Sequence, residues 1–306
     1  MTLKKELKDL NLLDRFLFAE AMEDPEIAAC ILEIILGKEI VLKHLPQTEK
    51  EHRKAAWSRQ IRLDVWAMDE ADTVYNTEVQ KQNTRNLPHR SRLYQGMIDS
   101  KLLEPGVIDY NQLNDVYIIM IMPFDLFGKG LYRYTFRMMG AESEGLELED
   151  GATRIFLNTR GTDPAGVSQE LIELLRYFEH TSKEVAEQST SEKIHRMQRK
   201  IETIKTNEEV GVKLMNAWEE KILERQEAFA EGMVQGAVQG EQKGHWTKLI
   251  DLVGRKKAQG QDPEKIAGDL LEEVEQVERI YQCMKEHPQL DAAAIYEKLM
   301  GNDASK

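Results

Sequence analysis

The stretch Ile61–Asn83 constrains the fold of this chain more than any other. Apolar and polar residues alternate over Ile61–Met68, and β-branched and aromatic residues are frequent over Val74–Gln80, so the sequence predicts two β-strands. The residues between them, 69–73, are polar turn formers, which favours an antiparallel hairpin with a short loop. Such a hairpin fixes which side chains of the two strands face each other.

The register of this hairpin brings two carboxylates together. If the pairing is symmetric about Ala71, Asp64 lies opposite Glu78, and Arg62 lies opposite Gln80. Like charges that face each other destabilise a sheet unless a cation lies between them. Carboxylate and amide oxygens are hard ligands, which suit Mg²⁺ or Mn²⁺ better than a soft metal. The alternative is that both carboxylates lie on the solvated face of an ordinary hairpin, each beside a basic side chain.

A run of basic side chains follows the hairpin, because no acidic residue occurs between Glu78 and Asp99. The segment contains Lys81, Arg85, Arg90 and Arg92. A positive strip beside a carboxylate pair attracts phosphate, so we expect these four residues, together with Arg62, to bind phosphate. A solvated basic loop without a ligand is the alternative.

The composition bounds the class of protein. Hydrophobic residues make up 41% and charged residues 31% of the 306 residues, which is typical of a soluble globular protein. The sequence contains neither a run of about 18 apolar residues, as a membrane span requires, nor an apolar signal core near its start. Cys30 and Cys283 lack metal-ligand spacing. We therefore expect a cytoplasmic protein without disulfides.

The net charge of −13 argues against a protein that coats nucleic acid non-specifically, but the charge is unevenly distributed. Residues 1–140 carry 19 basic and 21 acidic side chains, whereas residues 141–306 carry 22 and 33. The acidic excess therefore lies in the C-terminal half, away from the hairpin in sequence.

The sequence before the hairpin predicts a helical layer. Apolar residues follow a helical stripe over Leu12–Met22, and a second helix begins at Asp24-Pro25 and stops at Gly37. Ile40–Leu45 predicts a short strand, and the charged segment Glu49–Lys54 predicts a connector.

The sequence after the hairpin completes an α/β (α+β) core. A helix is predicted from Pro88 to about Leu103, and the apolar run Val116–Met122 predicts a strand buried on both faces. Leu131–Met139 and Thr153–Asn158 predict two further strands. We expect a central mixed sheet flanked by helices.

From Val167 onward the pattern is helical throughout. Helices are predicted over Glu184–Ile204, over Glu208–Ala230, from Asp262 to about Cys283, and over Asp291–Met300. Gly232, Gly236, Gly240 and Gly244 recur every four residues, which indicates either a weak helix or hinge, or a seam for self-association. We therefore expect a core domain at 1–165, a helical extension at 166–230, a glycine-repeat helix or hinge at 231–245 and a C-terminal helical region at 246–306.

Together these motifs resemble those of a known enzyme family. Asp64 followed by Glu78-Val79-Gln80 on the next strand resembles the PD-(D/E)xK nuclease motif in its variant with Gln in place of Lys. The resemblance extends over most of residues 10–245 to the bacterial recombination-promoting nuclease (Rpn) or transposase family. It is carried by Asp14 with Phe16 and Phe18, by the helix with Arg90, Arg92, Leu93 and Tyr94, by Val116–Met122 and by the glycine repeat.

The resemblance implies a restriction-endonuclease-like core that hydrolyses DNA phosphodiesters with Mg²⁺ or Mn²⁺. Asp64, Glu78 and the main-chain carbonyl of Val79 would hold the metal, which would activate an attacking water. Gln80 would orient water or ligate through its carbonyl, but it lacks the positive charge of lysine. Arg62 or Lys81 would restore that charge, and Glu20 or Glu33 is a further candidate ligand.

Other chemistry is not indicated by the sequence. The seven His residues form no zinc-binding pattern, and Gly128-Lys129-Gly130 lacks the remainder of a P-loop, so we expect no nucleotide cofactor. No helix-turn-helix is evident for a complete transposase. The alternative to an endonuclease is a weak or inactive nuclease-like module that binds DNA or protein and is regulated by its acidic helical tail. A homo-oligomer through the C-terminal helices is compatible with both functions.

Overall fold

The computed structural model describes the backbone of residues 5–43, 46–52, 61–103 and 106–303, and the side chains of these residues except 47–52, 61–64 and 301–303. The chain forms two compact units, Met1–Asn216 and Ala217–Lys306. The first unit contains the predicted mixed sheet with flanking helices, and the region after it is helical, so the predicted fold class is confirmed.

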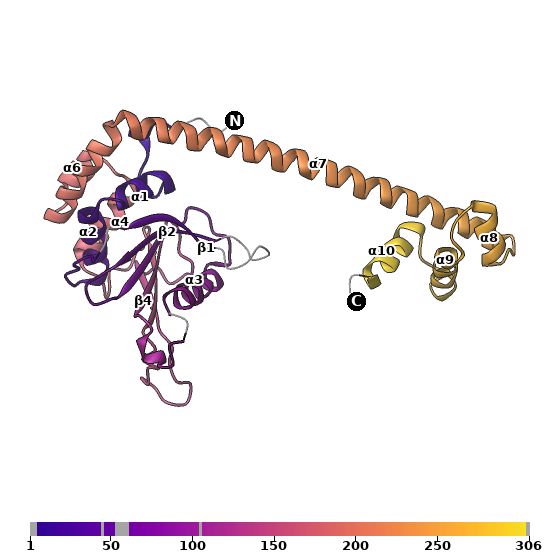
Figure 1. The fold of residues 1–306 in the computed structure, drawn as a ribbon, viewed down its shortest axis with the longest axis horizontal. Coiled ribbons are helices and arrows are strands. Elements are labelled where there is room, and N and C mark those ends of the chain that lie inside the picture. The colour runs from indigo at the N-terminus through magenta and orange to yellow at the C-terminus, as the bar shows by residue number, and fades with distance from the viewer. Residues whose placement is uncertain (1–4, 44–45, 53–60, 104–105, 304–306) are drawn as a thin grey trace. The chain divides into compact units, whose positions relative to one another are not determined.

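A six-stranded sheet in the order β1-β2-β3-β4-β6-β5 forms the centre of the first unit (Figure 1). Its strands are β1 Gln47–His52, β2 Ile61–Met68, β3 Val74–Val79, β4 Val116–Met122, β5 Arg133–Phe136 and β6 Ala152–Asn158. The β1, β2 and β3 strands are antiparallel, β3, β4 and β6 are parallel, and β5 runs antiparallel to β6. As predicted, the apolar β4 is a buried inner strand.

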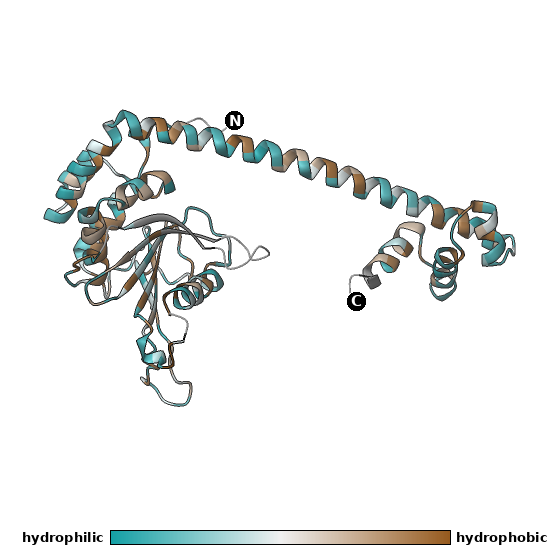
Figure 2. Ribbon diagram, in the orientation of Figure 1, coloured by the Kyte–Doolittle hydropathy of each residue, from teal (hydrophilic) through white to brown (hydrophobic). Residues whose placement is uncertain are grey.

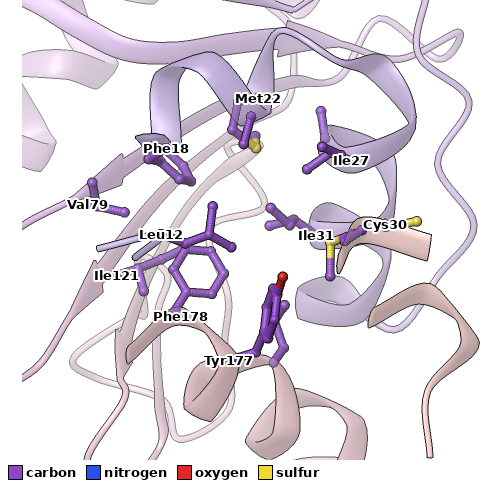
Figure 3. Close-up of a cluster of buried hydrophobic side chains, with 14 of the residues drawn as sticks. Leu12, Phe18, Met22, Ile27, Cys30, Ile31, Val79, Ile121, Tyr177 and Phe178 are labelled. Carbon is purple, nitrogen blue, oxygen red and sulfur yellow. The ribbon is translucent and has the colours of Figure 1, made fainter. Parts of the chain in front are cut away.

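Helices cover both faces of the sheet (Figure 1). One face packs against α1 (Arg15–Met22), α2 (Pro25–Leu36), α4 (Gln169–Glu179) and α6 (Glu192–Thr206). Figure 3 shows part of this core, in which Val79 and Ile121 of the sheet face Phe18, Ile31 and Phe178 of the helices. The other face packs against α3 (Leu87–Leu102). Side chains of β3 therefore alternate between two different environments.

The start and end of α2 follow from three residues. The carboxylate of Asp24 accepts hydrogen bonds from the backbone N–H groups of residues 26 and 27, and Pro25 occupies the first turn, where no N–H is needed. The helix stops at Gly37, whose φ of 69° lies in the left-handed region that glycine adopts without strain. The predicted boundaries of this helix are confirmed.

The loop of the β2–β3 hairpin is closed by Asp69. Its Oδ1 atom accepts hydrogen bonds from the N–H of Ala71 at 3.0 Å and of Thr73 at 2.9 Å, and its Oδ2 atom accepts one from Tyr75 Oη at 2.6 Å. Asp72 turns the chain with a φ of 59°. These bonds fix the loop and therefore the register of the hairpin.

Two predictions near the start of the sheet were wrong. Within the described part of Ile40–Leu45 the structure has no regular strand, and only Leu42 forms a bridge, to Asp69. Conversely, the predicted connector at Glu49–Lys54 overlaps β1, which pairs with β2 at the edge of the sheet. Charged residues suit an edge strand because they discourage pairing with a strand of another molecule. The same residues give the segment no apolar alternation, so the sequence did not predict a strand there.

Three other predicted elements differ from the structure, one because it is shorter and two because each is divided into two helices. Within Leu131–Met139 only β5 is a strand. The segment Glu184–Ile204 contains α5 (Lys183–Glu187) and α6, separated by Ser191, which caps α6. The predicted helix from Asp262 to Cys283 is divided into α8 (Pro263–Leu270) and α9 (Val274–Glu286), because Leu271 adopts a φ of 57°. Leu271 is 93% exposed, so no apolar contact opposes this break.

The helix α7 (Glu208–Ala258) begins in the first unit and ends in the second, and it contains all four glycines of the repeat. Hydrophobic and hydrophilic residues are interspersed along it (Figure 2). The second unit is completed by α8, α9 and α10 (Ala292–Asp303) around a small apolar core. Two short 3₁₀ helices, Leu7–Asp9 and Tyr110–Gln112, lie in the first unit. In the described part of the chain, no helix has the length and apolarity that crossing a membrane requires.

Candidate active site

The hairpin places the candidate site on the face of the sheet that α3 covers. Val65 pairs with Thr77 and Trp66 pairs with Asn76, so the register symmetric about Ala71 is confirmed. The paired residues of β2 and β3 end at Val65 and Thr77, and the same register, continued by one residue, would set Asp64 opposite Glu78. Since side chains alternate along a strand, these positions share the face of Trp66, which packs in the core beneath α3.

Glu78 is a charged residue in a buried position, with 6% of its surface exposed. An isolated carboxylate is costly to bury, so a partner cation is expected. Arg90 from the first turn of α3 provides it, because its Nη2 atom lies 2.5 Å from Glu78 Oε1. The same Nη2 atom donates to Gln80 Oε1 at 2.8 Å. One guanidinium therefore joins two of the candidate site residues, Glu78 in β3 and Gln80 just after it.

The surroundings of Arg90 hold its guanidinium in place. Pro88 lies at the start of α3, and the preceding Leu87 is fully buried against the sheet, which anchors this end of the helix. The guanidinium carbon lies 5.8 Å from the centre of the Tyr94 ring, one helical turn later, in a cation–π arrangement. On the strand side, the Gln80 amide donates to the carbonyl of Gln82 at 2.7 Å, which leaves its oxygen facing Arg90.

Asn76 extends the polar character of this face into the core. Its side chain is fully buried, and neither of its polar atoms has a hydrogen-bond partner among the described residues. Nearly all buried polar groups in proteins are satisfied, so this amide is an unusual member of a layer otherwise formed by apolar side chains. The sequence signal was the shared parity of Asn76, Glu78 and Gln80 on one strand.

A half-buried carboxylate, Asp99, lies further along α3. Burial raises the pKa of Asp99, while the hydrogen bond from Gln95 Nε2 at 2.9 Å and the charge of Arg154 oppose that rise. The register places Arg154 on β6 beside Ile118, which pairs with Asn76. Asn76 and Arg154 thus lie on either side of the apolar Ile118 in the part of the sheet beneath α3.

In the described contacts, the predicted cations Lys81, Arg85 and Arg92 form no ion pair with Glu78. Lys81 points to the opposite face of the sheet, where its Nζ atom forms an ion pair with Asp14. Arg85 is exposed in a loop with a φ of 58°, and Arg92 lies on the outer face of α3. Arg92 lines an open hollow of about 620 Å³ together with His89, Leu93, Gly96 and Met97. The side chains of Arg62 and Asp64 lie outside the described residues.

The two further candidate ligands are engaged on the other side of the sheet. Glu20 on α1 lies 3.1 Å from Lys213 Nζ, and Glu33 on α2 lies 2.9 Å from Lys193 Nζ. Both helices pack on the face opposite Glu78. Among the described side chains, no group of three His, Cys, Asp or Glu residues is arranged to hold a metal ion. The structure therefore brings together the side chains of Glu78, Gln80 and Arg90.

From the sequence, Arg90 was expected only as one of the four basic residues that follow the hairpin. Its pairing with Glu78 was missed because the contact depends on how α3 packs on the sheet. The available signal was the spacing of Arg90 and Tyr94, which places both on one face of the predicted helix.

Comparison with protein families agrees with this geometry. The model of a family described as "PD-(D/E)XK nuclease family transposase" matches residues 14–252, which is more than half of the chain. The match includes the sheet, both helical layers and most of α7. Searches of the curated proteins and of the solved structures found no match.

Proposed function

Because this chain belongs to the PD-(D/E)XK nuclease family of transposases, we propose that it is a metal-dependent DNA endonuclease of the recombination-promoting type. The observation that carries the proposal is the buried Glu78, and the register of β2 and β3, continued by one residue, would set Asp64 opposite it. Two carboxylates at neighbouring positions of one sheet face, beside an arginine, suit the hydrolysis of a phosphodiester.

The donor set fits a hard divalent cation. Glu78 and Gln80 present oxygen atoms on one face, and a carboxylate has about four lone-pair sites, so the bond from Arg90 leaves acceptor capacity on Glu78. Asp64, Glu78 and the main-chain carbonyl of Val79 would hold Mg²⁺ or Mn²⁺. When bound, this metal would polarise the phosphate and lower the pKa of a water molecule.

The remaining residues have roles that follow from their positions. Hydrolysis adds the hydroxyl of water to phosphorus, breaks one P–O bond and leaves the proton on the departing sugar oxygen. Gln80 would orient the water through its amide. Arg85 and Arg92 are exposed and would attract the DNA backbone, as would Arg62. Lys81, which is paired with Asp14, would contribute less to this attraction.

Plasmid cleavage tests the proposal. Purified protein should nick or linearise supercoiled plasmid in Mg²⁺ but not in EDTA, and Asp64→Ala and Glu78→Ala should each abolish cleavage. Glu39→Gln, an exposed position after α2, is a matched control that should cut normally. Cleavage that survives Asp64→Ala or Glu78→Ala would refute the assigned site. DNA binding without cleavage in any divalent metal would favour the alternative of an inactive module.

We also propose that two copies of the chain associate through α7. Phe229 is 70% and Met233 is 62% exposed, and helical spacing places them in line with Gly236 and Gly240. A Cβ atom added at either glycine would meet no atom within 4 Å. An apolar stripe that continues into glycines permits a second helix to approach closely, and the same stripe on a second copy would complement it.

A further inference from the structure

We propose that Arg90 supplies, from helix α3, the positive charge that a lysine at position 80 provides in the more usual form of the motif. The inference rests on the proposed endonuclease function. A nuclease of this chemistry needs a cation near the phosphate, because negative charge develops there in the transition state. Gln80 is neutral, so the charge has to come from another residue.

The distances support Arg90 as that residue. Its Nη2 atom is one hydrogen bond, 2.8 Å, from the end of the Gln80 side chain. A guanidinium at this position brings positive charge close to where the tip of a lysine at residue 80 would lie. The 2.5 Å contact with Glu78 fixes the same group beside the carboxylate that we assign to the metal. In this proposal, Gln80 occupies the position of the motif lysine, and Arg90 of α3 supplies the positive charge that the lysine would carry.

Arg90 also has N–H groups that form none of the described hydrogen bonds. A guanidinium carries five N–H groups, and both described hydrogen bonds of Arg90 use Nη2. Its Nε atom is buried and has no hydrogen-bond partner among the described residues. The Arg90 side chain is 25% exposed, and a guanidinium with unused N–H groups suits an anionic ligand with several oxygens, such as a phosphodiester.

The other described cations are less suited to this role. Lys81 follows Gln80 directly, but it lies on the opposite face and pairs with Asp14. Arg85 and Arg92 are exposed, and neither of them contributes a hydrogen bond to the pair formed by Glu78 and Arg90 in the described structure. In the described contacts, Arg90 combines a hydrogen bond to Gln80, an ion pair with Glu78 and a position over the Tyr94 ring.

Four variants of the full chain test the inference. Arg90→Met removes the positive charge at residue 90, and Arg90→Lys keeps it. The double variant Gln80→Lys/Arg90→Met moves the positive charge to residue 80, at the end of β3. Lys101→Met is the matched control, because Lys101 is an exposed cation near the end of the same helix. For each protein, kcat and KM for plasmid cleavage in Mg²⁺ are measured, and Mn²⁺ binding is measured separately by electron paramagnetic resonance.

Arg90→Met should lower kcat by about 10²-fold, the usual effect of removing one transition-state donor, and should leave Mn²⁺ affinity equal or tighter. Arg90→Lys should retain part of the activity, and the double variant should regain at least about tenfold in kcat over Arg90→Met. Lys101→Met should cut as the unaltered protein does.

Different outcomes overturn different parts of the inference. If Arg90→Met loses Mn²⁺ binding together with cleavage, Arg90 only positions Glu78, and the inference is wrong. It is also wrong if Arg90→Met cuts faster, if its kcat is unchanged, or if the double variant recovers nothing. If the unaltered protein does not cut in any divalent metal, the proposed endonuclease function is wrong, and the role of Arg90, which rests on it, is wrong as well. Cleavage that requires Asp64 but not Arg90 leaves the function intact and refutes only the role of Arg90.

Discussion

Asp24 and Lys200 are 176 residues apart in the sequence, yet Lys200 Nζ lies 2.7 Å from Asp24 Oδ2. The other oxygen of the same carboxylate caps α2, so one side chain both begins that helix and attaches α6 to it. Burial alone would raise the pKa of Asp24, but the bonds from Lys200 and from two backbone N–H groups outweigh it and lower the pKa. The pKa of Lys200 is raised by the same pair.

Asp24→Asn should therefore destabilise the protein in a pH-dependent way. Asparagine still caps the helix but loses the ion pair, so we expect a loss of about 0.5–1 kcal/mol at pH 7. Because the pKa of Asp24 is lowered by folding, its contribution is present above the unfolded pKa and disappears as the pH falls through the folded pKa. Urea denaturation at pH 7 and near pH 3 measures this, and a difference between the two proteins that is no smaller at the lower pH would contradict it. Glu39→Gln serves as an exposed control.

Asp99→Asn should stabilise the protein at high pH, in contrast to the destabilisation expected for Asp24→Asn. Burial raises the pKa of Asp99, so the ionised form is disfavoured in the folded state. The resulting destabilisation is absent below the unfolded pKa and fully present above the folded pKa. Asparagine keeps an oxygen to accept the bond from Gln95, so the variant should melt at a higher temperature at pH 8 and at an equal temperature near pH 3. A lower melting temperature at pH 8 would show that the carboxylate charge stabilises α3.

The ion pair between Glu78 and Arg90 should show strong coupling in stability. Removing the guanidinium by Arg90→Met leaves a carboxylate that is 6% exposed without this cation, and we expect a loss of about 1–3 kcal/mol in EDTA. Adding Glu78→Gln should restore part of that loss, because the buried charge is then gone. A double-mutant cycle on the free energy of unfolding measures the coupling, and additive effects within about 0.3 kcal/mol would contradict the pairing.

Self-association through α7 predicts a change in molar mass. Phe229→Asp with Met233→Asp places charges on the stripe that we assign to the second copy, so light scattering should give a lower mass than for the unaltered chain. Val234→Asp is the matched control, since Val234 is 64% exposed but lies away from the glycine stripe. An equal mass for the unaltered and doubly substituted chains would defeat this proposal.

The hairpin could be predicted from sequence because its determinants are local. Strand alternation, the turn formers after Asp69 and the parity of Glu78 and Gln80 all lie within one short segment. The same holds for α2, whose cap Asp24 and stop Gly37 are adjacent to the helix. These elements are specified by neighbours in the chain.

The elements that escaped prediction depend on contacts between distant segments. The polar β1 is a strand only because β2 offers a backbone to pair with. Leu271 interrupts a helical pattern that contains no glycine or proline at that point. The pairing of Arg90 with Glu78 follows from the packing of α3 on the sheet, which no local pattern in the sequence specifies.

The connection between β3 and β4 has a kinetic consequence. These strands are parallel, so the chain has to cross over the sheet between them, and α3 lies in that crossover. Hairpins close within microseconds, whereas pairing across a long connection is slower. The carboxylate positions of β2 and β3 would thus meet early, and Arg90 would reach them only when the crossover has docked. A refolding chain would form its hairpin before it recovered the ability to cut.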